Sequence, residues 1–201
     1  MVKLDFTKQE LKLIKRLDTP NKVQRFLDKT KYNFKDTTWS FRNVVKKKKA
    51  NCLEGALFVA VILSHHGYKP TIVCMEAKDD IDHNIFIYKS KGKYGSVAIS
   101  RDKGLKGRKP VYKTLRALIM SYYPYYYNYY TGDKSDITLR GFSDPIDLSK
   151  FKKDWITSKK DLKFIESYLY KIPYKKLFLR NKKLYKRTKP AKKGYYYSPK
   201  E

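Results

Sequence analysis

Cysteine, glycine and acidic residues are all scarce in this 201-residue chain, which has 2 cysteines, 9 glycines and 19 acids. The longest uninterrupted apolar run, residues 56–63, is far too short to cross a bilayer, and the N-terminal segment lacks the apolar core of a signal peptide. We therefore expect a cytoplasmic protein with no transmembrane segment. Because Cys52 begins a predicted helix and Cys74 lies in a predicted core strand, we expect two free thiols and no disulfide.

Several motifs of common chemistries are also missing from the sequence. It contains no glycine-rich phosphate loop, no CxxC pair and no HExxH motif, so nothing indicates nucleotide binding, a zinc finger or a zinc peptidase. His65 and His66 are adjacent at a predicted helix end, and neighbouring residues on a helix point in different directions. We therefore predict no metal site and no organic cofactor.

Positive charge is the most abundant feature. Lys and Arg number 47 against 19 Asp and Glu, giving a formal net charge of +28. A field of this sign attracts phosphate backbones, anionic lipid surfaces or acidic proteins. Codon bias would enrich lysine but would enrich the acids as well, so it does not explain all of the charge. Nucleic acid or another polyanion is thus one predicted class of partner.

The apolar content of 41% predicts one well-buried domain, residues 1–173, followed by a basic, disordered tail, residues 174–201. Within the domain we expect a helical cover over residues 1–31, a core over about residues 40–110 and C-terminal helices over 111–173. The tyrosine-rich stretch 125–130 is predicted to pack on the core, with base stacking as the alternative.

The periodicity predicts the following elements. Apolar runs indicate strands at 71–77, 83–88 and 94–100, the last two forming an antiparallel hairpin that turns at Gly92. Helices are expected at 112–123 and from a cap at Ser158 and Asp161 to Pro173. The segments 32–49 and 142–151 are predicted to be irregular, and residues 101–110 to form a basic loop with two glycines.

The helix that starts at Cys52 is the centre of the functional prediction. Asn51 can cap its first turn and Glu54 can complete a capping box, while residues 53–63 are apolar on nearly all sides, which predicts a buried helix. A helix N-terminus stabilises a thiolate, and the run Lys46–Lys49 adds positive potential, so we predict a Cys52 pKa below that of a free cysteine. Cys52 is a candidate nucleophile. The alternative is a plain buried cysteine.

His83 opens a predicted strand 31 positions after Cys52, a spacing that lets a helix, a turn and a strand bring the two side chains together. A thiol attacks a carbonyl carbon when an imidazole accepts its proton and a third group fixes the imidazole tautomer. Cys52 and His83 are therefore the predicted nucleophile and base.

Four short segments carry a resemblance to a known family. They are Asn51-Cys52-Leu53-Glu54-Gly55-Ala56, Gly67-Tyr68-Lys69-Pro70, Asp82-His83 and Gly92-Lys93-Tyr94-Gly95. The chain resembles the transglutaminase-like group of papain-type cysteine enzymes over roughly residues 40–172, and is most similar to an uncharacterised prokaryotic branch in which the hairpin precedes a segment like residues 109–116. The resemblance implies an α+β fold with a papain-like core, in which the nucleophile helix packs on an antiparallel sheet. It also implies acyl transfer to, or hydrolysis of, a protein or peptide amide through a thioester on Cys52, with His83 as the base.

The third catalytic position departs from the family pattern. Typical members carry an aspartate on the strand after the histidine, where this chain has Ala98 and Ser100, with Asp102 just beyond. We predict Ser100 as the positional counterpart and Asp102 as the chemically stronger alternative. The Cys52 backbone N–H and Trp39 are the predicted oxyanion donors. A scaffold that has kept the fold, lost the chemistry and binds nucleic acid or another polyanion is the alternative function.

Overall fold

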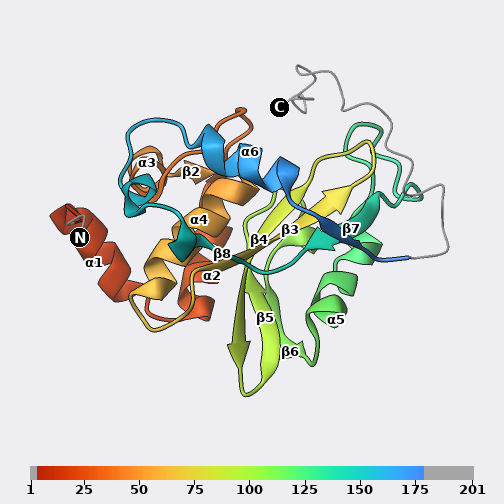
Figure 1. The fold of residues 1–201 in the computed structure, drawn as a ribbon, viewed down its shortest axis with the longest axis horizontal. Coiled ribbons are helices and arrows are strands. Elements are labelled where there is room, and N and C mark those ends of the chain that lie inside the picture. The colour runs from red at the N-terminus through yellow and green to blue at the C-terminus, as the bar shows by residue number, and fades with distance from the viewer. Residues whose placement is uncertain (1–3, 179–201) are drawn as a thin grey trace.

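An antiparallel sheet organises the fold, which belongs to the α+β class (Figure 1). The computed structural model describes residues 4–178. The main sheet has seven strands in the order β6-β5-β4-β3-β7-β9, with β8 also pairing with β3. Its strands are β3 (Thr71–Ala77), β4 (His83–Ser90), β5 (Lys93–Val97), β6 (Arg108–Tyr112), β7 (Leu139–Ser143), β8 (Ile146–Asp147) and β9 (Tyr174–Lys176). The helices are α1 (Lys8–Arg16), α2 (Pro20–Asp28), α3 (Phe41–Lys47), α4 (Cys52–Ser64), α5 (Leu115–Met120) and α6 (Lys163–Lys171).

Helix α4 is buried, as its apolar sequence predicts. Every residue from position 52 to 63 is buried, and the helix packs on the face of the sheet that carries Ile72, Phe86 and Val97. Helices α2 and α3 contact α4 in turn. Two short parallel strands, β1 (Lys31–Tyr32) and β2 (Lys49–Ala50), lead into its first turn. The start of α4 is therefore held by chain segments on several sides.

The opposite face of the sheet is covered by α5 and the tyrosines that follow it. Side chains alternate between the two faces of a strand, so Val73, Met75 and Ile85 point away from α4 and pack with Tyr122 and Tyr126. The sheet thus separates two apolar layers. This separation decides which side chains of β4 can meet Cys52.

The predicted strand 71–77 and the hairpin that turns at Gly92 are confirmed. Gly92 adopts a φ of 74°, which is unfavourable for residues with a Cβ atom. Three other predictions are wrong. Residues 41–47, predicted to be irregular, form α3 with Ser40 as its cap, residues 108–112 form an edge strand, and α5 is shorter than predicted.

The C-terminal part also differs from the prediction. Strand β7 occupies residues 139–143 beside β3, overlapping the predicted connector. Helix α6 begins without a side-chain cap, because Asp161 instead accepts the Thr38 N–H at 2.5 Å. The predicted tail starts too early, since β9 pairs with β7 and Leu177 is buried. Residues 179–201 of that tail lie outside the described residues. Within residues 4–178, no helix is long and apolar enough to cross a membrane.

Candidate active site

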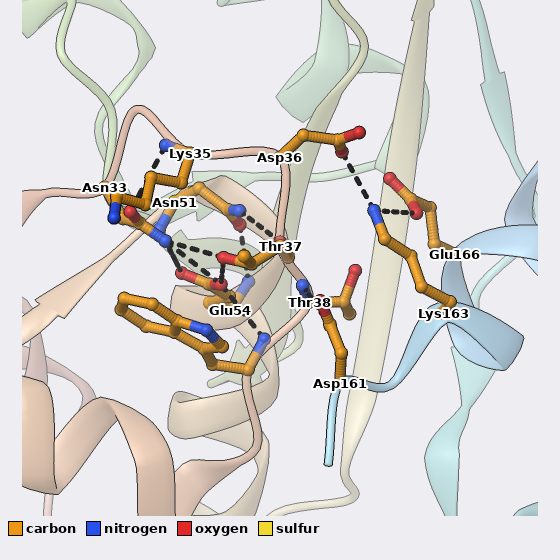
Figure 2. A network of polar contacts seen from close by, with 11 residues as sticks. Asn33, Lys35, Asp36, Thr37, Thr38, Asn51, Glu54, Asp161, Lys163 and Glu166 are labelled. Carbon is orange, nitrogen blue, oxygen red and sulfur yellow. Dashed lines mark hydrogen bonds and ion pairs between the residues drawn. The ribbon is translucent and has the colours of Figure 1, made fainter.

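The carboxylate of Glu54 holds the first turn of α4 in place (Figure 2). Glu54 is fully buried, and its two oxygens accept hydrogen bonds at 2.7 to 3.2 Å from four residues. The donors are the Asn33 side-chain amide, the Thr37 hydroxyl and the backbone N–H groups of Trp39 and Asn51. Burial raises the pKa of Glu54, and these hydrogen bonds oppose the shift. The predicted capping box is confirmed and is extended by a loop that precedes it in the sequence.

The loop over residues 33–38 is tied down from two further sides. The Asn51 side-chain amide donates to the Thr37 carbonyl at 2.7 Å, and the bond from Thr38 to Asp161 joins the loop to the segment before α6 (Figure 2). An exposed ion pair between Lys163 and Asp36, 2.9 Å long, lies beside this tie. The loop therefore presents a fixed surface next to Cys52.

The Cys52 sulfur lies at the beginning of β4. Its Sγ is 3.8 Å from the Asp82 carbonyl oxygen, a contact in which the thiol donates, and 4.0 Å from the Asn84 side-chain nitrogen, which donates to the sulfur. These two residues flank His83 in the sequence. The structure therefore brings the thiol to the backbone from which the His83 side chain projects.

The prediction of a lowered Cys52 pKa is wrong. The thiol is buried, and desolvation raises its pKa more than hydrogen bonds from Asn84 and the Leu53 N–H lower it. The helix N-terminus favours a thiolate, but withdrawal of the sulfur from water outweighs that effect. Cys52 is therefore a neutral thiol at neutral pH. As predicted, both cysteines are free.

His83 is buried with its imidazole on the face of the sheet opposite α4. Its Nε2 lies 2.8 Å from the Leu105 carbonyl oxygen. Its ring packs edge-to-face with that of Tyr122, with 6.4 Å between the two ring centres. A carbonyl can only accept, so Nε2 carries the hydrogen and Nδ1 keeps its lone pair. Burial lowers the pKa of His83 to about 4. Among the described residues, no hydrogen bond joins His83 to Cys52.

The structure does not bring Ser100 or Asp102 into hydrogen-bond contact with His83. The Ser100 hydroxyl accepts the Asp102 N–H at 3.1 Å, and the Asp102 carboxylate pairs with Arg101 at 3.3 Å. Strand β5 ends at Val97, so the alternation that placed Ser100 and Asp102 on one face does not extend to them. The orienting partner of His83 is the Leu105 carbonyl, a backbone group that side-chain spacing could not reveal.

The predicted oxyanion donors are also in other contacts. Trp39 binds Glu54 through its backbone, and Lys47 Nζ lies 4.9 Å from the centre of its ring. The Cys52 N–H donates a hydrogen bond to the hydroxyl of the half-buried Tyr32. Burial raises the pKa of Tyr32 well above its usual value, and the neighbouring Cys52 thiol adds to the shift. Tyr32 is therefore a site residue that sequence analysis missed.

Two more polar residues beside the thiol were missed. Asp82 is half-buried and its Oδ1 accepts the Ala77 N–H at 2.9 Å. Desolvation raises the pKa of Asp82 to about 7. The Asn84 carbonyl Oδ1 is buried and has no hydrogen-bond partner among the described residues. A sequence signal existed for Asn84, because a polar residue within an apolar strand next to a candidate base is costly to bury.

The remaining polar clusters do not extend this site. His65 and His66 each bind a backbone carbonyl at 2.8 Å, of Val61 and Ile14 respectively. Across the described residues, no group of three or more His, Cys, Asp or Glu side chains could hold a metal ion. In the tyrosine-rich stretch, Tyr126 is buried and donates to the Ile81 carbonyl at 2.8 Å, whereas Tyr125 is exposed. The predicted packing of the tyrosine-rich stretch on the core is thus confirmed for Tyr126.

Comparisons with known proteins leave the site to be judged from its own geometry. No protein-family model matches the chain, and no curated protein sequence matches it significantly.

Proposed function

We propose that this protein is a transglutaminase-like cysteine enzyme with a papain-type core, which uses Cys52 and His83 for acyl transfer or hydrolysis at an amide. The observation that carries the proposal is the position of the Cys52 sulfur, 3.8 Å from Asp82 and 4.0 Å from Asn84, the residues on either side of His83. Thiol acyl transfer needs a nucleophile and an imidazole of fixed tautomer. The start of β4 brings the thiol to the His83 backbone, while the His83 ring lies on the sheet face opposite α4.

The chemistry follows from the neutral state of both groups. Because the imidazole lies on the other face of the sheet, the proton of the Cys52 thiol passes to Nδ1 of His83 through a water molecule at the start of β4, as the sulfur forms a bond to the carbonyl carbon of the substrate. The carbon–nitrogen bond then breaks, and the imidazolium returns the proton to the departing amine. A thioester on Cys52 remains, and water or a second amine resolves it. The substrate is thus a protein or peptide amide.

The Leu105 carbonyl performs the role that an acidic side chain has in the related family pattern. It accepts the Nε2 hydrogen and so directs the basic Nδ1 to the reaction. A carbonyl stabilises an imidazolium less than a carboxylate does, which fits a base that stays neutral until the substrate binds. The substrate carbonyl oxygen would replace the Tyr32 hydroxyl at the Cys52 N–H, where this donor can stabilise the oxyanion.

An acylation experiment tests this function without knowledge of the natural substrate. The native protein is mixed with p-nitrophenyl acetate, and release of p-nitrophenolate is followed together with the mass of the protein. We expect one acetyl group per chain on Cys52. Cys52→Ser should abolish the acetylation, His83→Gln should slow it by about 10²-fold or more, and the matched control Cys74→Ser should leave it unchanged. Acetylation that is independent of His83 would contradict the proposal.

The alternative is a non-catalytic scaffold that binds nucleic acid or another polyanion. The formal charge of +28 favours it, and residues 179–201 hold only nine of the 47 Lys and Arg residues, so most of the charge lies on the described part of the chain. The exposed run Lys46–Lys49 leads directly into the start of α4. Binding of single-stranded DNA should weaken steeply with salt, and deletion of residues 179–201 should reduce the salt slope if the tail takes part.

A further inference from the structure

The carbonyl that orients His83 belongs to a short loop between β5 and β6. Leu105 ends a turn of 3-10 helix at Lys103–Leu105, and it is buried against the same apolar layer as Tyr122. A loop carbonyl can hold an imidazole in one tautomer only if the loop itself is fixed. The groups that fix this loop therefore control the base.

Arg108, the first residue of β6, binds the backbone on both sides of Leu105. Its guanidinium donates to the carbonyls of Gly104 and Lys106, the latter at 2.8 Å, and more weakly to that of Gly107 at 3.4 Å. The carbonyls next to Leu105 are thus drawn toward the guanidinium. The Leu105 carbonyl is left to accept the hydrogen of His83 at 2.8 Å.

The Arg108 guanidinium is itself fixed from the other side. It donates to the Ser121 hydroxyl at 3.2 Å and to the Ser121 carbonyl at 3.3 Å, and it lies 4.1 Å from the centre of the Tyr122 ring. The Arg108 backbone N–H donates to the Ser96 hydroxyl at 2.9 Å, which in turn bonds to the Tyr122 hydroxyl at 2.6 Å. Because Tyr122 also contacts the His83 ring, this network reaches the imidazole both at the Leu105 carbonyl and at the Tyr122 ring.

The loop has little space to adopt another shape. A Cβ atom at Gly104 would lie 2.5 Å from the Tyr125 side chain, and one at Gly107 would lie 2.6 Å from the Ser96 carbonyl oxygen. Gly104 thus lets the loop pack closely on the Tyr125 side chain, and Gly107 lets it approach the Ser96 backbone. Gly104, Gly107 and Arg108 therefore all help to keep the Leu105 loop in this shape.

We infer that Arg108 is a positioning residue for the base: it aims the Leu105 carbonyl at Nε2 of His83 and so keeps Nδ1 free to accept a proton. The inference rests on the proposed function for its catalytic meaning, but the placement of the imidazole can be measured independently. Lysine in place of Arg108 would keep the charge and lose the planar fork that reaches several carbonyls at once.

Other charges also act on His83, so the test must keep them constant. The carboxylate of Asp102 favours the imidazolium, while Arg108 and Arg101 disfavour it, and burial has the largest effect. Arg108→Lys preserves this charge pattern. Arg116→Lys is the matched control, because Arg116 also donates to a backbone carbonyl, that of Leu177, but lies away from the Leu105 loop.

The experiment is nitrogen-15 NMR of the histidine rings in the full chain, with the His83 signals identified by their loss in His83→Gln. We expect the wild type and Arg116→Lys to show a single Nε2–H tautomer and a His83 pKa near 4. Arg108→Lys should give a mixture of tautomers, because a loosened Leu105 carbonyl no longer selects the Nε2–H form. An unchanged tautomer in Arg108→Lys, or an Nδ1–H tautomer in the wild type, would overturn the inference.

A milder variant covers the case in which Arg108→Lys does not fold. Ser121→Ala removes one acceptor of the guanidinium and should give a smaller share of the second tautomer, whereas a single Nε2–H tautomer would count against the inference. Acylation of Cys52 by p-nitrophenyl acetate should also fall by up to about 10²-fold in Arg108→Lys. If the wild-type Cys52 is inert while the NMR signals move as expected, the proposed function fails and the positioning by Arg108 stands.

Discussion

Asn51 and Glu54 bind each other reciprocally at the start of α4: the Asn51 N–H donates to a Glu54 oxygen at 2.8 Å, and the Glu54 N–H donates to the Asn51 side chain at 3.0 Å. Cys52 lies between them in the sequence. The thiol is therefore held on a first turn that cannot fray without breaking both bonds. A fixed position favours a nucleophile, and the Glu54 carboxylate that fixes it is fully hydrogen-bonded.

The first prediction concerns the stability that Glu54 provides. Glu54→Gln replaces one acceptor oxygen by an NH2 group that faces the donors of residues 33, 37 and 39, so we expect the free energy of unfolding to fall by about 1 to 3 kcal/mol. Urea denaturation would measure it. The control is Glu166→Gln, whose partner Lys163 is largely exposed, with an expected change within about 0.5 kcal/mol. Equal effects of the two variants would contradict a special role of Glu54.

The elements that the sequence predicted well are those whose signal is local. The capping box at Asn51, the all-round apolar face of α4 and the Gly92 turn each depend on adjacent residues, and all three are confirmed. The site was predicted less well, because its contacts come from distant segments. The Leu105 carbonyl has no side-chain identity, and Tyr32 reaches Cys52 only through the pairing of β1 with β2.

The pKa of Cys52 was also predicted wrongly, because its largest contribution depends on how deeply the thiol is buried. The helix start and the lysine run could be found in the sequence, and both favour a thiolate. The depth of burial could not be found there, and desolvation is the larger effect. The missed strands have a related cause, since β7 and β9 are defined by pairing with partners far along the chain.

The second prediction tests the packing of α4 on the sheet at Gly55. A Cβ atom there would lie 2.3 Å from Cγ2 of Ile99, so the helix and the chain after β5 approach too closely for alanine. We expect Gly55→Ala to destabilise the protein by about 1 to 3 kcal/mol. In Ile99→Ala, which removes the colliding atom, the same glycine substitution should cost much less. Thermal denaturation of the four proteins of this double-mutant cycle gives the coupling, and additive effects would exclude the collision.

The third prediction concerns the two thiols. Cys52 is 8% exposed and Cys74 is 2% exposed, and burial raises the pKa of Cys74 well above its usual value. Because only thiolates react, iodoacetamide should label Cys52 before Cys74, and both more slowly than a free cysteine at neutral pH. The Cys52 rate should rise as the pH increases beyond 9. Mass spectrometry of peptides after brief treatment of the native protein would measure both sites, and equal or reversed labelling would refute the expectation.

The last prediction uses two adjacent groups, the half-buried Asp82 and the buried His83, whose pKa values shift in opposite directions. Burial raises the pKa of Asp82 from 3.8 to about 7, so between these values the folded protein binds a proton that the unfolded chain has lost. Stability from this group therefore falls as the pH rises from about 4 to about 7. Burial lowers the pKa of His83 from 6.5 to about 4, so there the unfolded chain binds the extra proton, and stability rises with pH over nearly the same range.

The two slopes oppose each other in the wild type, and single variants should expose them. In Asp82→Asn the free energy of unfolding should rise with pH between about 4 and 6.5, by roughly 3 kcal/mol relative to the double variant. In His83→Gln it should fall by a similar amount over about pH 4 to 7. Both replacements keep a hydrogen-bonding group, since asparagine can still accept from Ala77 and glutamine can still donate to Leu105. Urea titrations at several pH values measure the slopes, and slopes of the same sign in the two single variants would show that at least one of these groups is not held in its neutral form by burial.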